Sequence, residues 1–352
     1  MLDHGGDIQG FIDEFGYEPL DFSANVSPLG LPDEVVKAIE GCIAGLAAYP
    51  DPLCRKLTTA LGAHHGIDPT HILCGNGCSD LIYRIARVLE PKRALLAAPT
   101  FSEYATALSQ VNCNIKHHFL ASDTGYALDE SFIAAITDDI DVVFICQPNN
   151  PCGLITPRDI IERVLTRCNE IDAWLIVDEC FIEFIDNPTA TTMETRFADG
   201  EKLIILKAFT KLYGMAGLRL GYLLCADTTL VDRLRSAEQP WAVSTVAQTA
   251  GIAALSSTGY VENLRELVQV ERAFMKEKLA QLGIRAQGEA NYLFFELDDG
   301  GKLVCRLRQH GILIRDCSNF PGLKAGSYRI AILSHEKNEK LIAALEEALQ
   351  EK

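Results

Sequence analysis

The sequence predicts an α/β protein with a mostly parallel sheet in a large domain and a smaller second domain of α+β type. Between residues 70 and 225, short apolar runs alternate with segments of helical periodicity. The runs carry Val, Ile and Leu at both odd and even positions, which is typical of strands buried on both faces of a sheet. After residue 226, long helical segments precede further strand-like runs and a terminal helix. This change of pattern indicates the second domain.

Seven apolar runs are the expected strands of the large domain. Helical periodicity lies between them in residues 79–90 and 157–170, where Ser79 and Asp159 are the expected caps. An open α/β sheet places its ligand site where strands end and loops begin, so residues just after each run are the first candidates for function. In chain order the runs are HILC, RALLAAP, NIKHHFL, DVVFICQP, AWLIVDE, EKLIILKAF and LRLGYLLC.

The second domain begins with an almost continuous helical stretch, residues 230–282, which is broken at Pro240 and around residues 256–259. The runs NYLFFEL, GILIRDC and SYRIAIL follow it. The N-terminal segment has too few strands to fold alone, so we expect it to pack on the small domain or on a partner subunit. The expected units are an N-terminal segment (1–34), a large domain (35–230) and a small domain (231–352).

The composition limits the partners. The 352 residues include 32 Lys and Arg against 48 Asp and Glu, a formal net charge of −16. Such an acidic surface argues against nucleic acid and anionic membranes, and an anionic substrate would need positive charge local to its site. We find no signal peptide and no stretch of roughly 20 apolar residues, so we expect a cytoplasmic protein. The twelve cysteines lie mostly in apolar runs without metal-binding spacing, which predicts reduced thiols and no metal site.

Polar and aromatic groups follow four of the runs. GNGCSD, residues 75–80, places a glycine turn at an expected helix N-terminus, which suits a phosphate. Phe101 follows RALLAAP, where an aromatic ring can stack on a ligand or simply cover the core. QPNNPCG, residues 147–153, holds two asparagines, at least one of which should bond a ligand or the backbone. Asp178 ends WLIV, where a carboxylate either faces a cation or caps a neighbouring loop.

Two lysines stand at the end of the run LIILK. Lys207 belongs by position to the strand, whereas Lys211 falls past its end in a segment kept small by Gly214 and Ala216. A lysine among apolar and small residues, near Arg219, should have a lowered pKa and act as a nucleophile toward a carbonyl. A single lysine is usually a solvated surface charge. What favours function is that a phosphate cradle, an aromatic ring, Asn, Asp, Lys and Arg each stand at a strand end.

With these residues, essentially the whole chain resembles the fold-type I enzymes that depend on pyridoxal 5′-phosphate (PLP), in the aminotransferase group that includes histidinol-phosphate aminotransferase. The resemblance implies a three-layer α/β/α large domain with a mostly parallel sheet, and Lys211 as the catalytic residue that binds the cofactor covalently. It also implies that Asp178 pairs with the pyridine nitrogen, which keeps the ring able to accept the electrons of a broken Cα bond.

The same resemblance assigns the other cofactor contacts. Asn150 would bond the ring 3′-oxygen, and Phe101 would stack on the ring. Tyr49, in AAYPDP, matches a tyrosine that reaches the cofactor phosphate of the other subunit, which implies a homodimer with shared active sites. The implied cofactor-binding residues are Cys78, Ser79 and Arg219 at the phosphate, with Phe101, Asn150, Asp178, Thr210, Lys211 and Tyr49.

Two positions depart from the family pattern. The family often has Ser or Thr three residues before the lysine as a phosphate ligand, whereas this chain has Ala208, and Thr210 is the expected substitute. The usual tyrosine of the DEAY pattern is Phe181 here, so one hydrogen bond to the 3′-oxygen is missing. Neither change touches the groups that carry the chemistry.

Other stretches look like the branch of this family that decarboxylates L-threonine O-3-phosphate in cobalamin biosynthesis, releasing CO2 and (R)-1-amino-2-propanol O-2-phosphate. They are HGGDI, DFSANVSPLG, EQPWAVS, LIRDCSNFPGL and SYRIAI. Two arginines and a histidine can supply charge-assisted contacts to a phosphate and a carboxylate. Two questions stay open: which arginine binds which anion, and whether the protein prefers phosphothreonine or phosphoserine as substrate. The implied substrate-binding residues are His4, Gly5, Asn25, Asn150, Arg315 and Arg329.

Three other interpretations compete with a decarboxylase. A histidinol-phosphate-type aminotransferase would use almost the same pocket for a phosphorylated amine. A PLP-binding regulator would need a DNA-binding appendage, and we find no basic helix-turn-helix segment in the sequence. A scaffold without cofactor would purify colourless, whereas a PLP enzyme is yellow.

Overall fold

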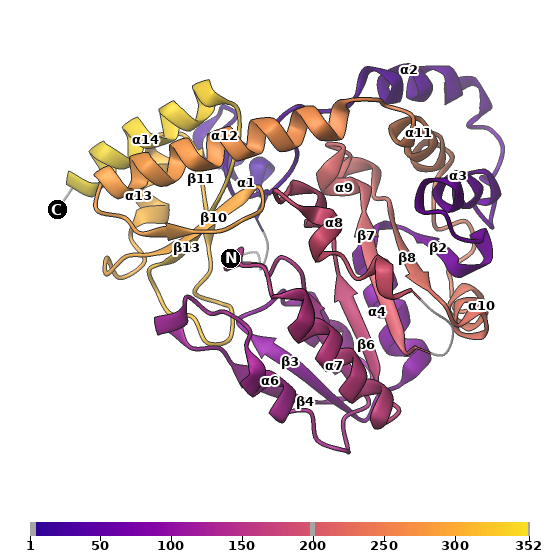
Figure 1. The fold of residues 1–352 in the computed structure, drawn as a ribbon. Coiled ribbons are helices and arrows are strands. Elements are labelled where there is room, and N and C mark those ends of the chain that lie inside the picture. Colours follow the sequence, from indigo (N-terminus) through magenta and orange to yellow (C-terminus); the bar gives the residue numbers. More distant parts are fainter. Residues whose placement is uncertain (1–4, 198–200, 351–352) are drawn as a thin grey trace.

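A seven-stranded sheet forms the centre of the larger part of the molecule (Figure 1). The computed structural model describes residues 5–197 and 201–350. The strand order is β2-β8-β7-β6-β5-β3-β4, in which β4, β3, β5, β6 and β7 run parallel and β8 runs antiparallel to both its neighbours. The expected mostly parallel sheet is therefore confirmed. Its strands are β2 (Ile72–Gly75), β3 (Arg93–Ala98), β4 (Asn114–Phe119), β5 (Val142–Cys146), β6 (Trp174–Asp178), β7 (Leu203–Ala208) and β8 (Gly221–Cys225).

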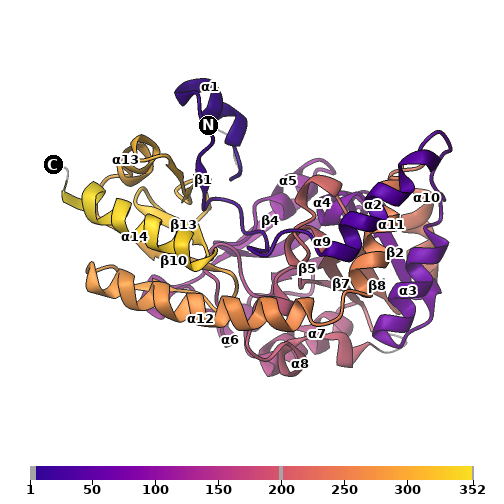
Figure 2. The same cartoon turned by 90° about the horizontal axis from the view of Figure 1, so that it is seen from above.

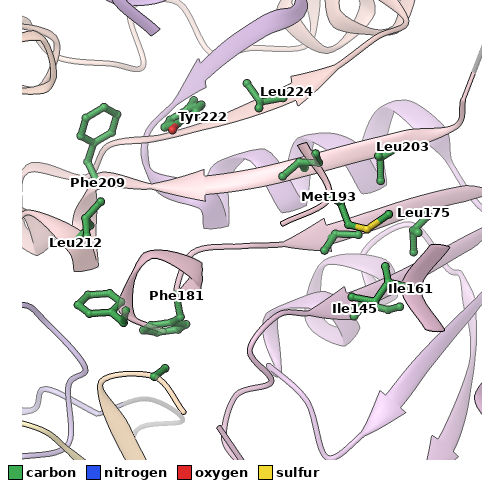
Figure 3. Close-up of a cluster of buried hydrophobic side chains, with 14 of the residues drawn as sticks. Ile145, Ile161, Leu175, Phe181, Met193, Leu203, Phe209, Leu212, Tyr222 and Leu224 are labelled. Atoms are coloured by element: carbon green, nitrogen blue, oxygen red, sulfur yellow. The ribbon is translucent and has the colours of Figure 1, made fainter. Parts of the chain in front are cut away.

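Helices cover both faces of this sheet (Figures 1 and 2). Successive residues of β7 show why the strand is apolar on both parities, since Ile205 belongs to one buried cluster and Ile204 to the other. Figure 3 shows part of the first cluster, where Leu203, Leu175 and Met193 lie together. That cluster packs under α3 (Arg55–His65), α7 (Arg158–Glu170) and α11 (Thr245–Leu255), and the second under α4 (Gly77–Leu89), α5 (Glu103–Ser109) and α10 (Thr228–Ser236).

A second, antiparallel sheet lies beside the first, with the order β12-β13-β10-β9. The long helix α12 (Tyr260–Gln281) extends from the α11 end of the molecule to this sheet (Figure 1). Near the N-terminus, β1 (Leu20–Asp21) pairs in parallel with β11 (Ile312–Leu313), and Phe22 joins the apolar cluster of this part. Its other elements are β9 (Ala286–Gln287), β10 (Tyr292–Glu296), β12 (Arg315–Asp316), β13 (Ser327–Ala331), α13 (Leu303–Gln309) and α14 (His335–Gln350).

The remaining helices are short or peripheral. Helix α2 (Asp33–Cys42) packs on α11, and α9 (Phe209–Leu212) follows β7 directly. None of the helices in the described ranges is long and apolar enough to cross a membrane. The others are α1 (Ile8–Phe15), α6 (Glu130–Ala134), α8 (Pro188–Thr191) and the 3₁₀ helices η1 (Ile43–Gly45), η2 (Pro69–His71), η3 (Ser122–Thr124), η4 (Ile182–Phe184), η5 (Glu194–Arg196) and η6 (Ala216–Leu218).

Two local expectations were wrong. The run NIKHHFL is not buried on both faces, because β4 is an edge strand with β3 as its one neighbour in the sheet, and Phe119 is exposed. Ser79 and Asp159 are not helix caps, because α4 and α7 begin earlier, after Asn76 and Pro157. Helix α4 can start at Gly77 because that glycine adopts φ +81°, which most residues avoid.

Candidate active site

A cavity of about 330 Å³ lies at the carboxyl ends of β5, β6 and β7. Groups from both sheets and from the N-terminal segment line it. It brings together nearly all the residues that the sequence singled out. Those residues are Gly5, Asn25, Cys78, Ser79, Phe101, Asn150, Asp178, Thr210, Lys211, Arg219, Arg315 and Arg329.

Two predicted residues are not among the lining. His4 lies outside the described residues. Tyr49 is 77% exposed and stacks on Trp241, with ring centroids 4.2 Å apart. Its expected contact is with another subunit, so its role stays a prediction.

Lys211 enters the cavity from α9, immediately after β7. The turn is fixed by its backbone carbonyl, which accepts a hydrogen bond from the Ser27 N–H at 2.9 Å. Burial lowers the pKa of Lys211 to about 8, and the positive charges of Arg329 and Arg219 add to this effect. The direction agrees with the prediction from the sequence, although burial and Arg329 contribute more than Arg219. At pH 7 about a tenth of such an amine is uncharged, far more than for an ordinary lysine, and this form can attack a carbonyl.

The other lysine lies on the opposite face of β7. The Lys207 side chain is 6% exposed and forms ion pairs with Glu179, at 3.3 Å, and with Glu194. These carboxylates raise the pKa of Lys207, although burial opposes them, so its amine stays charged. Lys207 borders a separate cavity of about 480 Å³, on the side of α3 and α12. The expectation that Lys207 is a strand residue is confirmed.

Asp178 is the last residue of β6 and is 5% exposed. Both of its carboxylate oxygens accept hydrogen bonds: Oδ2 from the Tyr104 hydroxyl at 2.7 Å and Oδ1 from the Cys180 N–H at 3.0 Å. Burial raises the pKa of Asp178, while the two hydrogen bonds act in the opposite direction. A carboxylate held this way suits a cationic ring nitrogen.

Glycines shape the start of α4 into an open cradle. A Cβ on Gly221 would lie 2.7 Å from the backbone nitrogen of Cys78, and one on Gly77 would lie 2.7 Å from Arg219 Nη2. The N-terminus of this 13-residue helix therefore lies against the Arg219 guanidinium, with Ser79 also lining the cavity. Backbone N–H groups, a helix dipole and an arginine together suit a phosphate.

Asn150 links this region to the second sheet. Its Oδ1 accepts a hydrogen bond from Arg329 Nη1 at 2.5 Å, and Arg329 Nη2 donates to the Ser23 carbonyl at 2.8 Å. Asn149, in contrast, bonds away from the cavity, with its Nδ2 donating to the Pro99 carbonyl at 3.0 Å. Of the two asparagines in QPNNPCG, one is thus structural and the other faces the site.

Two arginines lie opposite one another on neighbouring strands of the second sheet. Arg315 of β12 and Arg329 of β13 are directly opposite partners, and they are 6% and 7% exposed. Arg315 donates to Asn319 at 2.8 Å, and its guanidinium lies 5.3 Å from the centroid of Phe320. Within the described ranges no carboxylate lies at ion-pair distance from Arg329, and its buried Nε has no hydrogen-bond partner. Asn25 also lines the cavity, and neither of its side-chain polar atoms has a partner among the residues that the structure describes.

Sequence reasoning missed several residues of the site, but most lie inside stretches that it quoted. Ser23 and Ala24 belong to DFSANVSPLG, and Phe320 belongs to LIRDCSNFPGL. Glu103 and Tyr104 lie two and three residues after Phe101. Closeness in the sequence to a predicted site residue could therefore have identified most of them. The further lining residues are Ser23, Ala24, Glu103, Cys146, Cys180 and Phe320.

These groups fit PLP. The cavity offers a lysine of lowered pKa for the aldehyde, a carboxylate for the ring nitrogen and a glycine-lined helix N-terminus for the phosphate. Phe101 lines the same cavity and can cover a ring face. Phe181 lines it too, at the position where the family has a tyrosine. Polar atoms of Asn25 and Arg329 that have no partner within residues 5–197 and 201–350 can bind a polar substrate.

Comparison with known proteins gives consistent results. A family model described as "Aminotransferase class I and II" matches residues 17–345. The threonine-phosphate decarboxylase of Salmonella typhimurium is 37% identical over 98% of this chain and 96% of that protein. The solved histidinol-phosphate aminotransferase from Clostridium acetobutylicum has a TM-score of 0.87 and 29% identity, covering 93% of this chain and 98% of that one. L-threonine-O-3-phosphate decarboxylase from Porphyromonas gingivalis has a TM-score of 0.83 and 26% identity, covering 94% and 100%. The expected architecture is confirmed.

Proposed function

This chain belongs to the class I and II aminotransferase family, and we propose that within the family it decarboxylates a phosphoamino acid, O-phospho-L-threonine or O-phospho-L-serine. The products are CO2 and either aminopropanol phosphate, from phosphothreonine, or ethanolamine phosphate, from phosphoserine. Aminopropanol phosphate is the linker used in cobalamin biosynthesis. Similarity to the Salmonella threonine-phosphate decarboxylase over nearly the full length supports this activity.

The observation that carries the proposal is the pair of opposed arginines. Like charges directly opposite each other in neighbouring strands repel, and burial makes the repulsion costlier. Arg315 and Arg329 are nonetheless both buried beside Lys211 and Asp178. A substrate with two anionic groups can form charge-assisted hydrogen bonds with both guanidinium groups. A phosphoamino acid has such a pair of groups, a carboxylate and a phosphate.

The cofactor is PLP, and this chain's own residues can hold each part of it. We assign Lys211 to the aldehyde carbon, Asp178 to the ring nitrogen and Asn150 to the 3′-oxygen. When bound, PLP supplies an electron sink for whichever Cα bond of the substrate stands perpendicular to its ring. The assigned phosphate and ring contacts are Cys78, Ser79, Thr210 and Arg219 with Phe101.

The choice of bond rests on the substrate contacts. We assign the carboxylate to Arg329, because its charge acts on Lys211 and it bonds Asn150, which places it on the cofactor side of the cavity. We assign the phosphate to Arg315, which is held by Asn319 and Phe320. Gripping the carboxylate fixes which Cα bond faces the ring. Lys211, with a pKa of about 8, can then deliver a proton from Nζ to Cα. Asn25, Gly5 and His4 complete the assigned substrate contacts.

We further propose a homodimer in which Tyr49 reaches the cofactor phosphate of the partner subunit. Exposed apolar side chains gather in residues 29–53 and at Trp241, on which Tyr49 stacks. A second copy would cover them. We also propose a cytoplasmic location and the three-part division at residues 34/35 and 230/231, in which the N-terminal segment packs on the small domain. The exposed apolar residues are Leu29, Leu31, Val36, Ile43, Leu46, Tyr49, Leu53 and Trp241.

Two parallel incubations test the activity. In one, the PLP-loaded enzyme receives O-phospho-L-threonine labelled in its carboxyl group, and released CO2 is counted. In the other, it receives histidinol phosphate with 2-oxoglutarate, and glutamate is measured. Labelled CO2 without glutamate supports the decarboxylase. Glutamate without CO2 would establish the histidinol-phosphate-type aminotransferase instead. Absence of both products would refute either activity.

A further inference from the structure

Tyr104 is a buried residue with no role so far beyond its hydrogen bond to Asp178. It belongs to α5, and its side chain is 0% exposed. Its hydroxyl lies 2.7 Å from Asp178 Oδ2, across 74 residues of sequence. The other oxygen of Asp178 is held by the Cys180 N–H. The carboxylate is therefore held on one side by a backbone group and on the other by the Tyr104 hydroxyl, and the Cys180 thiol is a further hydrogen-bond partner.

Aromatic packing on two sides fixes the Tyr104 ring. It stacks on Phe144 of β5, with centroids 4.9 Å apart and an interplanar angle of 20°. It meets Phe101 in a T-shaped contact, with centroids 5.5 Å apart. Phe101 lines the cavity and is the residue assigned to the cofactor ring. One tyrosine thus supports both a ring-stacking phenylalanine and the partner of the ring nitrogen.

Electrostatics makes the Tyr104 hydroxyl a donor. Burial raises the pKa of Tyr104 well above its ordinary value, and Asp178 raises it further, so the hydroxyl keeps its proton. Burial also raises the pKa of Asp178, and hydrogen bonds from Cys180 and from Tyr104 oppose that rise. The other titratable groups around the carboxylate are the neutral thiols of Cys180 and Cys146 and the Tyr292 hydroxyl. Tyr104 is therefore the one side-chain hydroxyl among the described residues that donates to Asp178.

We propose that Tyr104 is a positioning residue: its hydroxyl keeps Asp178 ionised and oriented so that this carboxylate can bind the protonated ring nitrogen of PLP. The proposal needs PLP as cofactor, but it holds for a decarboxylase and an aminotransferase alike. Failure of the proposed reaction and failure of this role are thus separate results.

The test compares two ligands of the apoprotein, PLP and 1-deazapyridoxal 5′-phosphate, in which a C–H group replaces the ring nitrogen. Dissociation constants are measured by absorbance titration, and the readout is the ratio of the analogue's constant to that of PLP. Because a hydrogen bond to a charged group is involved, Tyr104→Phe should lower this ratio about tenfold or more. A purely structural role would weaken both ligands equally and leave the ratio unchanged, which would overturn the proposal.

Two other variants frame the result. Tyr126→Phe removes a comparable buried tyrosine hydroxyl, which donates to Glu296 at 3.1 Å and does not line the active-site cavity. This variant should keep the wild-type ratio. Asp178→Asn gives the ratio expected when the ring nitrogen has lost its ionic partner. If Tyr104→Phe does not fold, Tyr104→His retains a ring N–H donor. Its ratio should exceed that of Asp178→Asn by about tenfold. Equality of those two ratios would refute the role of Tyr104.

Discussion

Replacing Lys211 with methionine should stabilise the apoprotein. Lys211 is partly buried at the wall of the cavity, and burial together with Arg329 and Arg219 lowers its pKa from 10.5 to about 8. A lowered folded-state pKa means that the charged amine favours the unfolded chain. This penalty is present in full below about pH 8, and it disappears as the pH rises from 8 toward 10.5. Methionine fills a similar volume without a charge and removes the penalty.

The size of the effect follows from the shift. A difference of 2.5 pKa units corresponds to about 3 kcal/mol at pH 7 and less than about 1 kcal/mol at pH 10. Urea unfolding of the apoproteins measures it. PLP must be removed first, because a ligand of the native state would stabilise the wild type by mass action. The midpoint of Lys211→Met should exceed that of the wild type at pH 7 and approach it at pH 10.

The same substitution at the other lysine provides the control, with the opposite sign expected. Lys207→Met leaves Glu179, whose side chain is 0% exposed, without its cation, and breaking a buried pair in this way costs about 3–5 kcal/mol. Lys207→Met should therefore unfold at lower urea while still binding PLP. A Lys211→Met protein that is no more stable than wild type at pH 7, or whose gain does not change with pH, would refute the reasoning about Lys211.

Three further predictions concern the substrate, the ion cluster and the phosphate cradle. Arg329→Leu should lower kcat/KM for O-phospho-L-threonine by about 100-fold or more, since two charge-assisted hydrogen bonds are lost; a loss below threefold in steady-state assays would remove Arg329 from the site. Although burial alone would raise it, hydrogen bonding from His65 and the charge of Lys207 hold the pKa of Glu194 at about 2 instead of 4.5. Glu194 therefore contributes about 3 kcal/mol of stability above pH 4.5, and this contribution is lost as the pH falls toward 2. The free energy of unfolding of Glu194→Gln should therefore fall less steeply with decreasing pH than that of the wild type; an unchanged slope would contradict this. Gly77→Ala should destabilise the apoprotein by about 1–3 kcal/mol through strain at positive φ and, by displacing Arg219, should weaken PLP binding in an absorbance titration; wild-type affinity would exclude this cradle.

The sheet and much of the site could be predicted because both depend on local sequence patterns. Strands buried on two faces need apolar residues on both parities, as in β7, and polar groups at strand ends meet at one edge of a parallel sheet. Lys211 and Asp178 stand at such ends, so their order in the chain predicts their proximity.

Other features depend on contacts between segments far apart in the sequence, which no local pattern encodes. The hydrogen bond of Tyr104 to Asp178 joins residues 74 apart, and the opposition of Arg315 and Arg329 depends on a strand register. The strand pattern of NIKHHFL misled because an edge position is a property of the whole sheet. The expected role of Tyr49 concerns a second subunit, which one chain cannot encode locally.

The central claim is that this chain removes the carboxylate of a phosphoamino acid and keeps its amino group. The most direct measurement is a reaction of the PLP-loaded enzyme with O-phospho-L-threonine in D2O, followed by NMR. We expect equal amounts of CO2 and 1-amino-2-propanol O-2-phosphate, with one deuterium on the carbon that carried the carboxylate. A 2-oxo acid phosphate formed only when a keto-acid acceptor is present, with no CO2, would contradict it.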